Sequence, residues 1–280
     1  MAGYLTRFAP SPTGPLHLGH AFSALTAFGR AQAAGGRMLL RIEDIDRARC
    51  RAEWVALIRE DLCWLGLDWP EPVMRQSERQ AEYRAALRRL DALGVTYPCR
   101  CSRGDIRAAL SAPQEGAAGP DGPIYPGTCR GRSLAEAGPE DAIRLDMARA
   151  MRIARSLRFR DSGPVHPGDH ERGPDEMAAT VGDIVLSRRD IGTSYHLAVV
   201  VDDAAQGVTE VVRGADLFPA TPIHVLLQRL LELATPVYHH HALIRDEHGK
   251  RLAKRDDARA IRLYRQDGAT PEQIRRRVGL

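Results

Sequence analysis

Two short segments of this sequence carry side chains suited to phosphate chemistry, and the first lies near the N-terminus. His17 and His20 stand three residues apart, with Gly14 before them and Gly19 between them. At that spacing two imidazoles can face the same side of a first helical turn, hydrogen-bond phosphate oxygens and stabilise charge in a transition state. A helix start attracts anions, and the glycines would let a nucleotide approach the backbone closely. Histidines that merely satisfy the helix start, or a fragment of a metal site, are the alternative interpretations.

The second segment holds both lysines of the chain, Lys250 and Lys254. All the other basic side chains among the 40 lysines and arginines are arginine. A compact ammonium group and a planar guanidinium bind phosphates differently. The two lysines therefore indicate a loop that contacts a polyphosphate whose charge shifts during a reaction. A basic turn on the surface is the alternative.

The elements around the first segment have the pattern of a β-α-β unit. Residues 6–9 favour a short strand, and the prolines and glycine of residues 10–15 break it into a tight loop. Apolar residues then recur at helical spacing from Leu18, a glycine pair at Gly35 ends the helix, and residues 37–42 favour a second strand. This order predicts a parallel sheet in an α/β fold. Ligands of such sheets bind beyond the carboxyl ends of the strands.

The rest of the chain divides by composition. Further helices are predicted at residues 51–66, 79–93 and 221–233, the last with Thr221 as N-cap. Strand-like apolar runs stand at residues 183–186, 195–201 and 208–212. The stretch from 97 to about 180 is rich in Cys, Gly and Pro, and we expect it to be an insertion into the sheet domain. We predict that residues 1–96 and 181–256 form the two halves of the sheet domain and that residues 97–180 form the insertion. Residues 257–280 are predicted to form a short helical segment.

Composition narrows the class of protein. With 280 residues, 44% of them apolar and 27% charged, the chain fits a globular protein that can bury a core. Five cysteines are too few for a disulfide scaffold and favour a reducing setting. No apolar run reaches the roughly 18–20 residues needed to cross a bilayer, and no secretory leader is predicted. A net charge of +4 permits an RNA partner without requiring one. We expect a cytoplasmic monomer with no membrane partner.

Together the two phosphate-directed segments resemble the paired signatures of the class I aminoacyl-tRNA synthetases. The string His17-Leu18-Gly19-His20 resembles their His-Ile-Gly-His motif. Residues 250–255 contain a version of their Lys-Met-Ser-Lys loop, with Leu252 and Ala253 in place of Met and Ser. The string at residues 7–14 resembles the glutamyl and glutaminyl subgroup, and further blocks resemble the glutamyl enzymes, at residues 41–46, 195–203 and 212–216. The resemblance implies a class I synthetase-type Rossmann fold, a parallel sheet flanked by helices, with ATP as a substrate and Mg²⁺ beside it.

The resemblance also implies a glutamate pocket. Arg7 and Arg213 can each offer a bidentate fork to one of the two carboxylates of glutamate. Glu43 can receive the ammonium group, while Tyr195 and Ser11 add a phenol and a hydroxyl. The residues implied to bind glutamate are Arg7, Phe8, Ala9, Pro10, Ser11, Glu43, Tyr195 and Arg213. ATP would contact Gly14, His17, Gly19, His20 and Lys254, and the catalytic residues would be His17, His20, Lys254 and, as a weaker helper, Lys250.

A third constellation lies in the predicted insertion. Cys99, Cys101 and Cys129 offer three thiolates, and zinc prefers four tetrahedral ligands. Some glutamyl-type relatives place a tyrosine phenolate at the fourth position, which implies Tyr125 here; water or a nearby acid is the alternative. We expect a structural Zn²⁺ in this subdomain, and three free thiols are the other interpretation. The three histidines of residues 239–241 are predicted to be polar surface with one buried ring, since adjacent strand residues face opposite sides.

The sequence ends soon after the lysine segment, whereas glutamyl-tRNA synthetases continue into helical anticodon-binding domains. It thereby resembles truncated paralogs of those enzymes that transfer activated glutamate to queuosine in the anticodon of tRNA(Asp). We expect no anticodon-binding domain here. The partners that the resemblance implies are glutamate, ATP and queuosine-containing tRNA(Asp). Alternatives are esterification of a tRNA 3′ end, a non-catalytic paralog that binds tRNA or amino acid, and a different nucleotidyltransferase such as a pantothenate-activating type.

Overall fold

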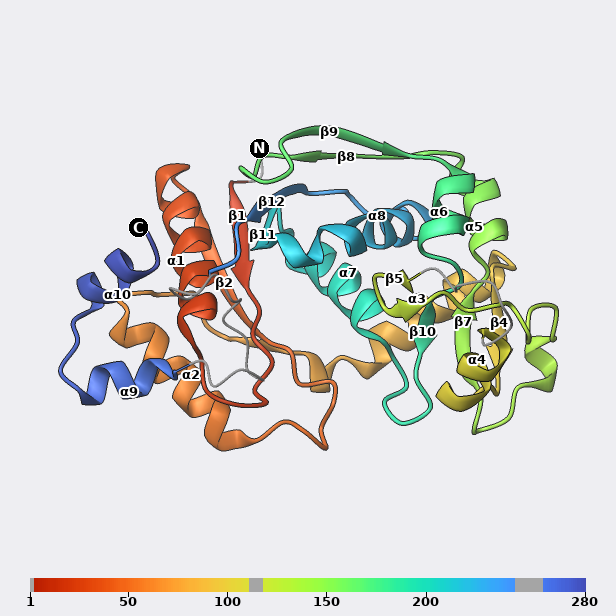
Figure 1. Ribbon diagram of the computed structural model, residues 1–280, viewed down its shortest axis with the longest axis horizontal. Coiled ribbons are helices and arrows are strands. Elements are labelled where there is room, and N and C mark those ends of the chain that lie inside the picture. The colour runs from red at the N-terminus through yellow and green to blue at the C-terminus, as the bar shows by residue number, and fades with distance from the viewer. Residues whose placement is uncertain (1–2, 111–117, 245–258) are drawn as a thin grey trace.

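The computed structural model describes residues 3–110, 118–244 and 259–280. Figure 1 shows an elongated molecule, with the C-terminal helices at one end and most of the cysteine-rich stretch at the other. Within the described residues no helix has both the length and the apolar character that a bilayer crossing requires.

The predicted β-α-β unit is confirmed. Strand β1 (Leu5–Phe8) and strand β2 (Arg37–Ile42) pair in parallel, and helix α1 (Leu18–Ala33) connects them. The helix stops at the predicted glycines because Gly35 adopts a φ of +64°, a left-handed conformation that favours glycine. A short strand, β3 (Met74–Arg75), extends this sheet beside β2.

A second set of parallel strands lies beside the first. Strand β11 (Glu210–Gly214) pairs in parallel with β12 (Val237–His241), and β12 pairs in parallel with β8 (Leu157–Asp161). Strand β9 (Gly168–Arg172) forms an antiparallel hairpin with β8 at the edge. Thr209, in the loop before β11, accepts a hydrogen bond from Leu5 N and donates one to the Leu5 carbonyl oxygen. Leu5 is the first residue of β1, so the two sets of strands adjoin (Figure 1). The predicted α/β fold with parallel strands and flanking helices is therefore confirmed.

Residues 195–201 form a helix, so the prediction of a strand there is wrong. Helix α7 (Tyr195–Ala205) begins after Ser194, whose hydroxyl accepts a hydrogen bond of 3.4 Å from the third helical N–H. The run is apolar without alternation, a pattern that fits a buried helix as well as a buried strand. Helix α7 packs against α3 (Gln80–Ala92) and α8 (Thr221–Leu230), which bury most of its side chains.

Helix α8 begins at the predicted residue, but the prediction of Thr221 as its N-cap is wrong. Ala220 holds the N-cap position and Thr221 is already helical, because a 3₁₀ turn over Ala215–Ala220 runs directly into the helix. The Thr221 hydroxyl instead accepts a hydrogen bond from Arg213 in β11. The predicted helices at residues 51–66 and 79–93 are confirmed as α2 (Ala52–Trp64) and α3.

The stretch predicted as an insertion contains a small antiparallel sheet and a hairpin. The sheet has the order β10 (Val185–Ser187), β7 (Ala142–Leu145), β4 (Thr96–Cys99), and the hairpin joins β5 (Ala118–Gly119) to β6 (Gly122–Pro123). Strands β8 and β9 also fall within residues 97–180, yet β8 pairs with β12 and β9 with β8, so both belong to the β11–β12 sheet. The division of the chain into domains stays a prediction.

The remaining elements are short helices and turns. They are α4 (Arg103–Leu110), α5 (Met147–Ala154), α6 (Pro174–Thr180), α9 (Ile261–Gln266) and α10 (Pro271–Arg277), with 3₁₀ turns at Gln76–Glu78 and Leu134–Glu136. Helices α9 and α10 bury Ile261 and Ile274 in the same core as α1 and α2. Cys63 of α2 is exposed, because the buried stripe of that helix runs through Ile58 and Leu62.

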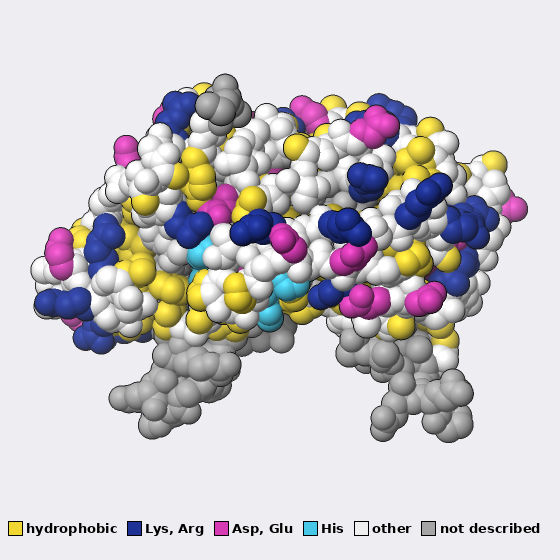
Figure 2. Space-filling view, turned by 90° about the horizontal axis from the view of Figure 1, so that it is seen from above, with side chains coloured by type: hydrophobic (Ala, Val, Ile, Leu, Met, Phe, Trp, Pro, Cys, Tyr) yellow, Lys and Arg dark blue, Asp and Glu magenta, His cyan; other side chains and the backbone are white. Residues whose placement is uncertain are grey.

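The arginines of the β8–β9 hairpin are paired with acidic residues across the strands. Arg158 lies 3.2 Å from Glu171, and Arg160 lies 3.7 Å from Asp169. Figure 2 shows basic and acidic side chains interspersed over one face of the molecule instead of gathered by sign. The hairpin arginines therefore form exposed ion pairs between the two strands.

Candidate active site and cysteine cluster

A pocket of about 450 Å³ lies beyond the carboxyl ends of β1, β2 and β11, at the start of helix α1. Every residue predicted to bind glutamate lines it, namely Arg7, Phe8, Ala9, Pro10, Ser11, Glu43, Tyr195 and Arg213. His17, Gly19 and His20 line the same pocket, whereas Gly14 is not among its lining residues. Lys250 and Lys254 lie outside the described residues. The residues predicted to bind glutamate are thus brought together with His17, Gly19 and His20, and the individual roles of these residues remain predictions.

One side of the pocket is a network of opposite charges. Asp203 Oδ1 of helix α7 binds Arg7 Nε at 2.9 Å and Arg41 Nη1 at 2.6 Å. Arg41 Nη2 also lies 3.3 Å from Glu43 Oε1. Burial alone would raise the pKa of Asp203, but the two guanidinium charges outweigh burial and hold the pKa below its ordinary value. At Glu43 burial outweighs the arginines and raises the pKa of the carboxyl group.

The other side of the pocket is built around Arg213 and uses uncharged partners. Arg213 Nε donates to His240 Nε2 at 3.1 Å, and Nη1 donates to His224 Nδ1 at 3.0 Å. Nη2 donates to Thr221 Oγ1 at 2.7 Å. Arg213 is only 5% exposed and forms no ion pair with a carboxylate in the described part of the chain. A buried guanidinium among neutral acceptors keeps an uncompensated positive charge, which an anionic ligand can neutralise.

All three histidines of β12 are buried, so the prediction of polar surface with one buried ring is wrong. Their exposed fractions are 8% for His239, 0% for His240 and 4% for His241. The reason is that β12 is an interior strand between β11 and β8, with covered side chains on both faces. Ser162 Oγ lies 3.0 Å from His239 Nδ1, and Ser23 Oγ lies 2.8 Å from His241 Nε2.

The two histidines at the start of α1 hold each other in a defined arrangement. His17 Nδ1 accepts a hydrogen bond from Gly19 N at 3.1 Å, and His20 Nδ1 accepts one from His17 N at 3.2 Å. Their ring centroids lie 3.8 Å apart. A neutral imidazole that accepts at Nδ1 carries its proton on Nε2. Nε2 is therefore the nitrogen from which each ring can donate a hydrogen bond to a phosphate oxygen.

The described residues on both sides of the lysine segment lie at this pocket. Leu243 and Ile244 line it just before the segment. After the segment, Ala260 forms an antiparallel bridge with His17, and Ile261 N donates to the carbonyl oxygen of the residue before His17 at 2.8 Å.

Three thiols and a phenol converge near the far end of the molecule. Tyr125 Oη lies 3.4 Å from Cys99 Sγ and from Cys101 Sγ, and Cys101 Sγ lies 3.5 Å from Cys129 Sγ. Tetrahedral zinc with Zn–S bonds of about 2.3 Å places its ligand atoms about 3.5–3.8 Å apart. These three separations fit a zinc site, and thiolates are among the ligands that zinc prefers. Burial alone would raise the pKa of the Cys129 thiol, but hydrogen bonds, above all from Tyr125, lower it to about 7.

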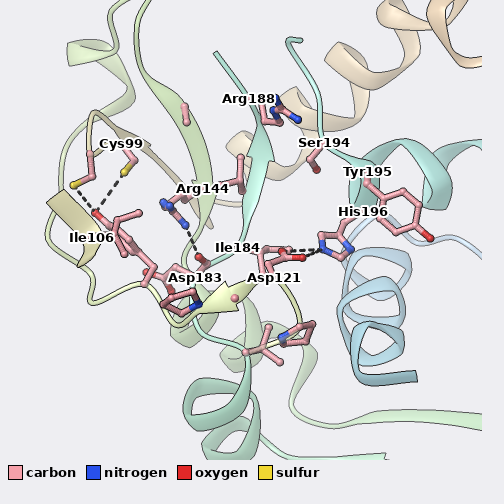
Figure 3. A pocket seen from close by; sticks show the side chains of 18 of the residues that line it. Cys99, Ile106, Asp121, Arg144, Asp183, Ile184, Arg188, Ser194, Tyr195 and His196 are labelled. Atoms are coloured by element: carbon pink, nitrogen blue, oxygen red, sulfur yellow. Dashed lines mark hydrogen bonds and ion pairs between the residues drawn. The ribbon is translucent and has the colours of Figure 1, made fainter. Parts of the chain in front are cut away.

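A larger pocket of about 960 Å³ lies between the cysteine cluster and helix α7 (Figure 3). Asp121, Arg144 and Arg188 line it together with Tyr195 and His196. His196 Nε2 lies 3.0 Å from an Asp121 carboxylate oxygen, and Figure 3 shows this pair facing the pocket. Tyr195 lines both pockets, so the side chain stands between the two cavities.

Sequence reasoning missed several residues that shape the pocket of about 450 Å³. We call it the glutamate-directed pocket, because every residue predicted to bind glutamate lines it. Asp203 and Arg41 stand in strings that resemble the glutamyl enzymes, but no role was predicted for them. An acidic pair at the end of the apolar run of α7 was a usable signal, because a buried carboxylate requires a partner. No comparable signal marked His224 or His240, since neither motif nor spacing relates them to Arg213.

Comparison with known proteins bears on the whole chain. Residues 4–280 match the family model described as "tRNA synthetases class I (E and Q), catalytic domain". The chain is 61% identical over 280 residues to a protein of Rhodobacter capsulatus named Glutamyl-Q tRNA(Asp) synthetase, covering 99% of this chain and 100% of that protein. A protein of the same name from Nocardia farcinica is 45% identical, over 96% of this chain and 81% of its own length.

Solved structures agree with that relationship. A glutamate tRNA ligase from Elizabethkingia meningosepticum, in complex with its amino acid, matches with a TM-score of 0.73 at 29% identity, over 91% of this chain. This chain spans about half of that ligase, 52% of its length. A Mycobacterium tuberculosis methionyl-tRNA synthetase bound to methionyl-adenylate shares the fold, with a TM-score of 0.59 at 11% identity, over 99% of this chain and 64% of its own. The chain belongs to the class I tRNA synthetases of the glutamyl and glutaminyl type, a family of ligases.

Proposed function

We propose that this protein activates glutamate with ATP and transfers the glutamyl group to queuosine in the anticodon of tRNA(Asp). The observation that carries the activation step is the pocket that gathers Arg7, Glu43, Arg213 and the start of α1 at one edge of the sheet. The full-length identity of 61% to a protein named Glutamyl-Q tRNA(Asp) synthetase supports the RNA acceptor.

In this proposal each charged group of glutamate meets a group of opposite charge. Arg213 and Arg7 bind the two carboxylates, and Glu43 receives the ammonium. Tyr195 adds a neutral donor from the boundary with the larger pocket. Ser11 contributes by holding the site together, since its hydroxyl donates to the Glu43 carbonyl oxygen at 3.0 Å. Phe8, Ala9 and Pro10 supply the wall between them.

Activation is an in-line transfer at the α-phosphorus of ATP, which enters as its magnesium complex. An oxygen of the glutamate α-carboxylate forms a bond to that phosphorus as the bond to the leaving pyrophosphate breaks. His17 and His20, donating from Nε2, stabilise charge on the phosphate together with Lys254 and, more weakly, Lys250. Gly14 and Gly19 keep the backbone open beside the nucleotide. A hydroxyl of the RNA then attacks the glutamyl carbonyl carbon, and AMP leaves.

The cysteine cluster is proposed to hold a structural zinc ion through Cys99, Cys101, Cys129 and Tyr125. Burial, followed by the neighbouring thiols, raises the pKa of the Tyr125 phenol, so a phenolate there needs an adjacent cation. Cys129→Ser is expected to abolish stoichiometric zinc and to lower the midpoint of thermal unfolding, with the KM for glutamate changed little. Tyr125→Phe is expected to weaken zinc retention against a chelator. Wild-type protein that takes up no zinc on reconstitution would contradict this assignment.

The function is tested by transfer of labelled glutamate, with ATP, to tRNA from cells that make queuosine and from cells that cannot. Label confined to the queuosine-containing pool, and kept when the 3′-terminal adenosine has been removed, is the expected result. Label that disappears with the terminal adenosine would support ordinary charging instead, the candidate that the likeness to a glutamate tRNA ligase favours. Glutamate-dependent ATP–pyrophosphate exchange, measured in parallel, tests activation by itself. Its absence would favour a non-catalytic paralog.

A further inference from the structure

The groups behind Arg213 determine which ring nitrogen carries the proton in three buried histidines. A guanidinium only donates hydrogen bonds, so its two ring partners, His240 Nε2 and His224 Nδ1, must each present a lone pair. A neutral imidazole that accepts at one nitrogen donates at the other. Each ring therefore has one N–H left, and the structure supplies an acceptor for each.

His240 is held by a buried carboxylate on the neighbouring strand. Its Nδ1 donates to Asp161, which is 1% exposed and also accepts from Gly163 N at 2.7 Å. A Cβ on Gly163 would lie 2.4 Å from backbone atoms of His240, so the loop after β8 is pressed against this strand. Burial, followed by the charge of Arg213, lowers the pKa of His240 to about 4. The ring is therefore neutral at pH 7 and keeps its acceptor for Arg213.

His224 is held by a second ring. Its Nε2 lies 3.0 Å from His196 Nδ1, so it donates to that ring. His196 consequently carries its proton on Nε2, which lies 3.1 and 3.0 Å from the two carboxylate oxygens of Asp121. Figure 3 shows the Asp121–His196 end of this chain in the larger pocket. The direction of every hydrogen bond from Arg213 to Asp121 thus follows from the guanidinium.

We propose that His240 and His224 are positioning residues that fix the guanidinium of Arg213 through single, defined tautomers. Asp161 sets the tautomer of the first ring, and Asp121, acting through His196, sets that of the second. This inference rests on the proposed function, since it takes Arg213 to bind a carboxylate of glutamate. A long side chain loses conformational entropy when it is ordered, and a site that orders it in advance lowers the cost of binding.

The two rings present opposite nitrogens to Arg213, which allows a crossed test with amides. An asparagine carries its amide at the distance of His Nδ1 from the backbone, and a glutamine carries its amide at the distance of Nε2. His224→Asn and His240→Gln therefore keep an acceptor for Arg213. His224→Gln and His240→Asn lose it. The same two substitutions at His170, a half-buried histidine of β9 outside both pockets, provide the control.

The expected result is a crossed pattern in the KM for glutamate, measured by ATP–pyrophosphate exchange. His224→Gln and His240→Asn should raise that KM by at least about tenfold, or about 1.4 kcal/mol, with kcat and the KM for ATP changed much less. His224→Asn and His240→Gln should show clearly smaller increases, and the His170 variants should match the wild type. The same ranking of Asn and Gln at both positions would overturn the proposal, because a purely structural role depends on size and not on tautomer.

Nitrogen NMR of the histidine rings in the folded wild-type protein tests the tautomers independently of any variant. A proton on Nδ1 of His240 and on Nε2 of His224 is expected. Either ring doubly protonated at pH 7, or carrying its proton on the nitrogen that faces Arg213, would overturn the proposal. Failure of the proposed function is distinguishable, since it would remove glutamate-dependent exchange from the wild type while leaving the ring tautomers unchanged.

Discussion

The two arginines of the glutamate-directed pocket are held in different ways, although both are buried and line the same cavity. Arg7 binds the carboxylate of Asp203, which also binds Arg41, so opposite charges compensate one another within the protein. Arg213 donates to two imidazoles and a hydroxyl, none of which carries a negative charge. The charge of Arg7 is thus shared before any ligand binds, whereas that of Arg213 remains available to an anion.

This difference predicts which substitutions act on folding stability and which act on ligand binding. Removing one member of a buried ion pair leaves the other charge without a partner and costs about 3–5 kcal/mol of stability. Changing a cation that has only neutral partners removes chiefly its attraction for an anionic ligand. Substitutions on the β1–β2–α7 side of the pocket should therefore act mainly on stability. Those on the β11–β12–α8 side should act mainly on glutamate affinity.

The largest effect is expected from Asp203→Asn, which removes the carboxylate shared by Arg7 and Arg41. Two buried guanidiniums then lose their common partner, so the free energy of unfolding should fall by about 3–5 kcal/mol. Denaturant unfolding at pH 7 measures it. The matched control is Glu171→Gln, which breaks an ion pair with Arg158 whose side chains are 52% and 77% exposed. It should change stability little. Equal losses in the two variants would contradict the role given to the buried network.

Arg213→Lys is expected to lower stability less than Asp203→Asn and to act mainly on the binding of glutamate. The ammonium keeps the charge but cannot reproduce the three-way contact of the guanidinium. The KM for glutamate should rise by at least about tenfold, or about 1.4 kcal/mol, while the free energy of unfolding falls by less than in Asp203→Asn. Arg7→Lys provides the contrast, since it should lower stability as well as affinity. If Arg7→Lys spares stability and Arg213→Lys does not, the comparison between the two sides fails.

The sequence allowed the local parts of this pocket to be predicted and not the contacts between distant parts. Arg7 and Ser11, like His17 and His20, stand in short strings whose spacing places them on one loop and one helix start. The bond from Arg7 to Asp203 joins residues 196 positions apart, and no local pattern encodes it. Alternation within a strand likewise says which side chains share a face, not whether neighbouring elements cover that face. The buried histidines of β12 were mispredicted for that reason, whereas α7 was mispredicted because an apolar run without alternation fits a buried strand and a buried helix equally.

Asp61 of α2 sharpens the comparison, because its buried carboxylate has weaker support than that of Asp203. Its carboxylate is 0% exposed and accepts no hydrogen bond among the described residues, while Arg265 Nη1 of α9 lies 3.6 Å away. Burial raises the pKa of Asp61 to about 6, and the charge of Arg265 only partly opposes it. Since the folded protein holds this proton more tightly than the unfolded chain, ionisation of Asp61 destabilises the fold increasingly as the pH rises from about 4 to above 6.

Asp61→Asn should therefore stabilise the protein at pH 7.5 and not at pH 4. The gain has an upper limit of about 3 kcal/mol from the pKa shift, and a buried amide without a hydrogen bond offsets about 1–3 kcal/mol of it. A net gain of about 1 kcal/mol at pH 7.5 is expected, the smallest of the effects considered. Denaturant unfolding of the variant and the wild type at both pH values measures it. A gain of the same size at both pH values would show that ionisation of Asp61 does not destabilise the fold. Arg265 would then compensate the charge of Asp61 as Arg7 and Arg41 compensate that of Asp203.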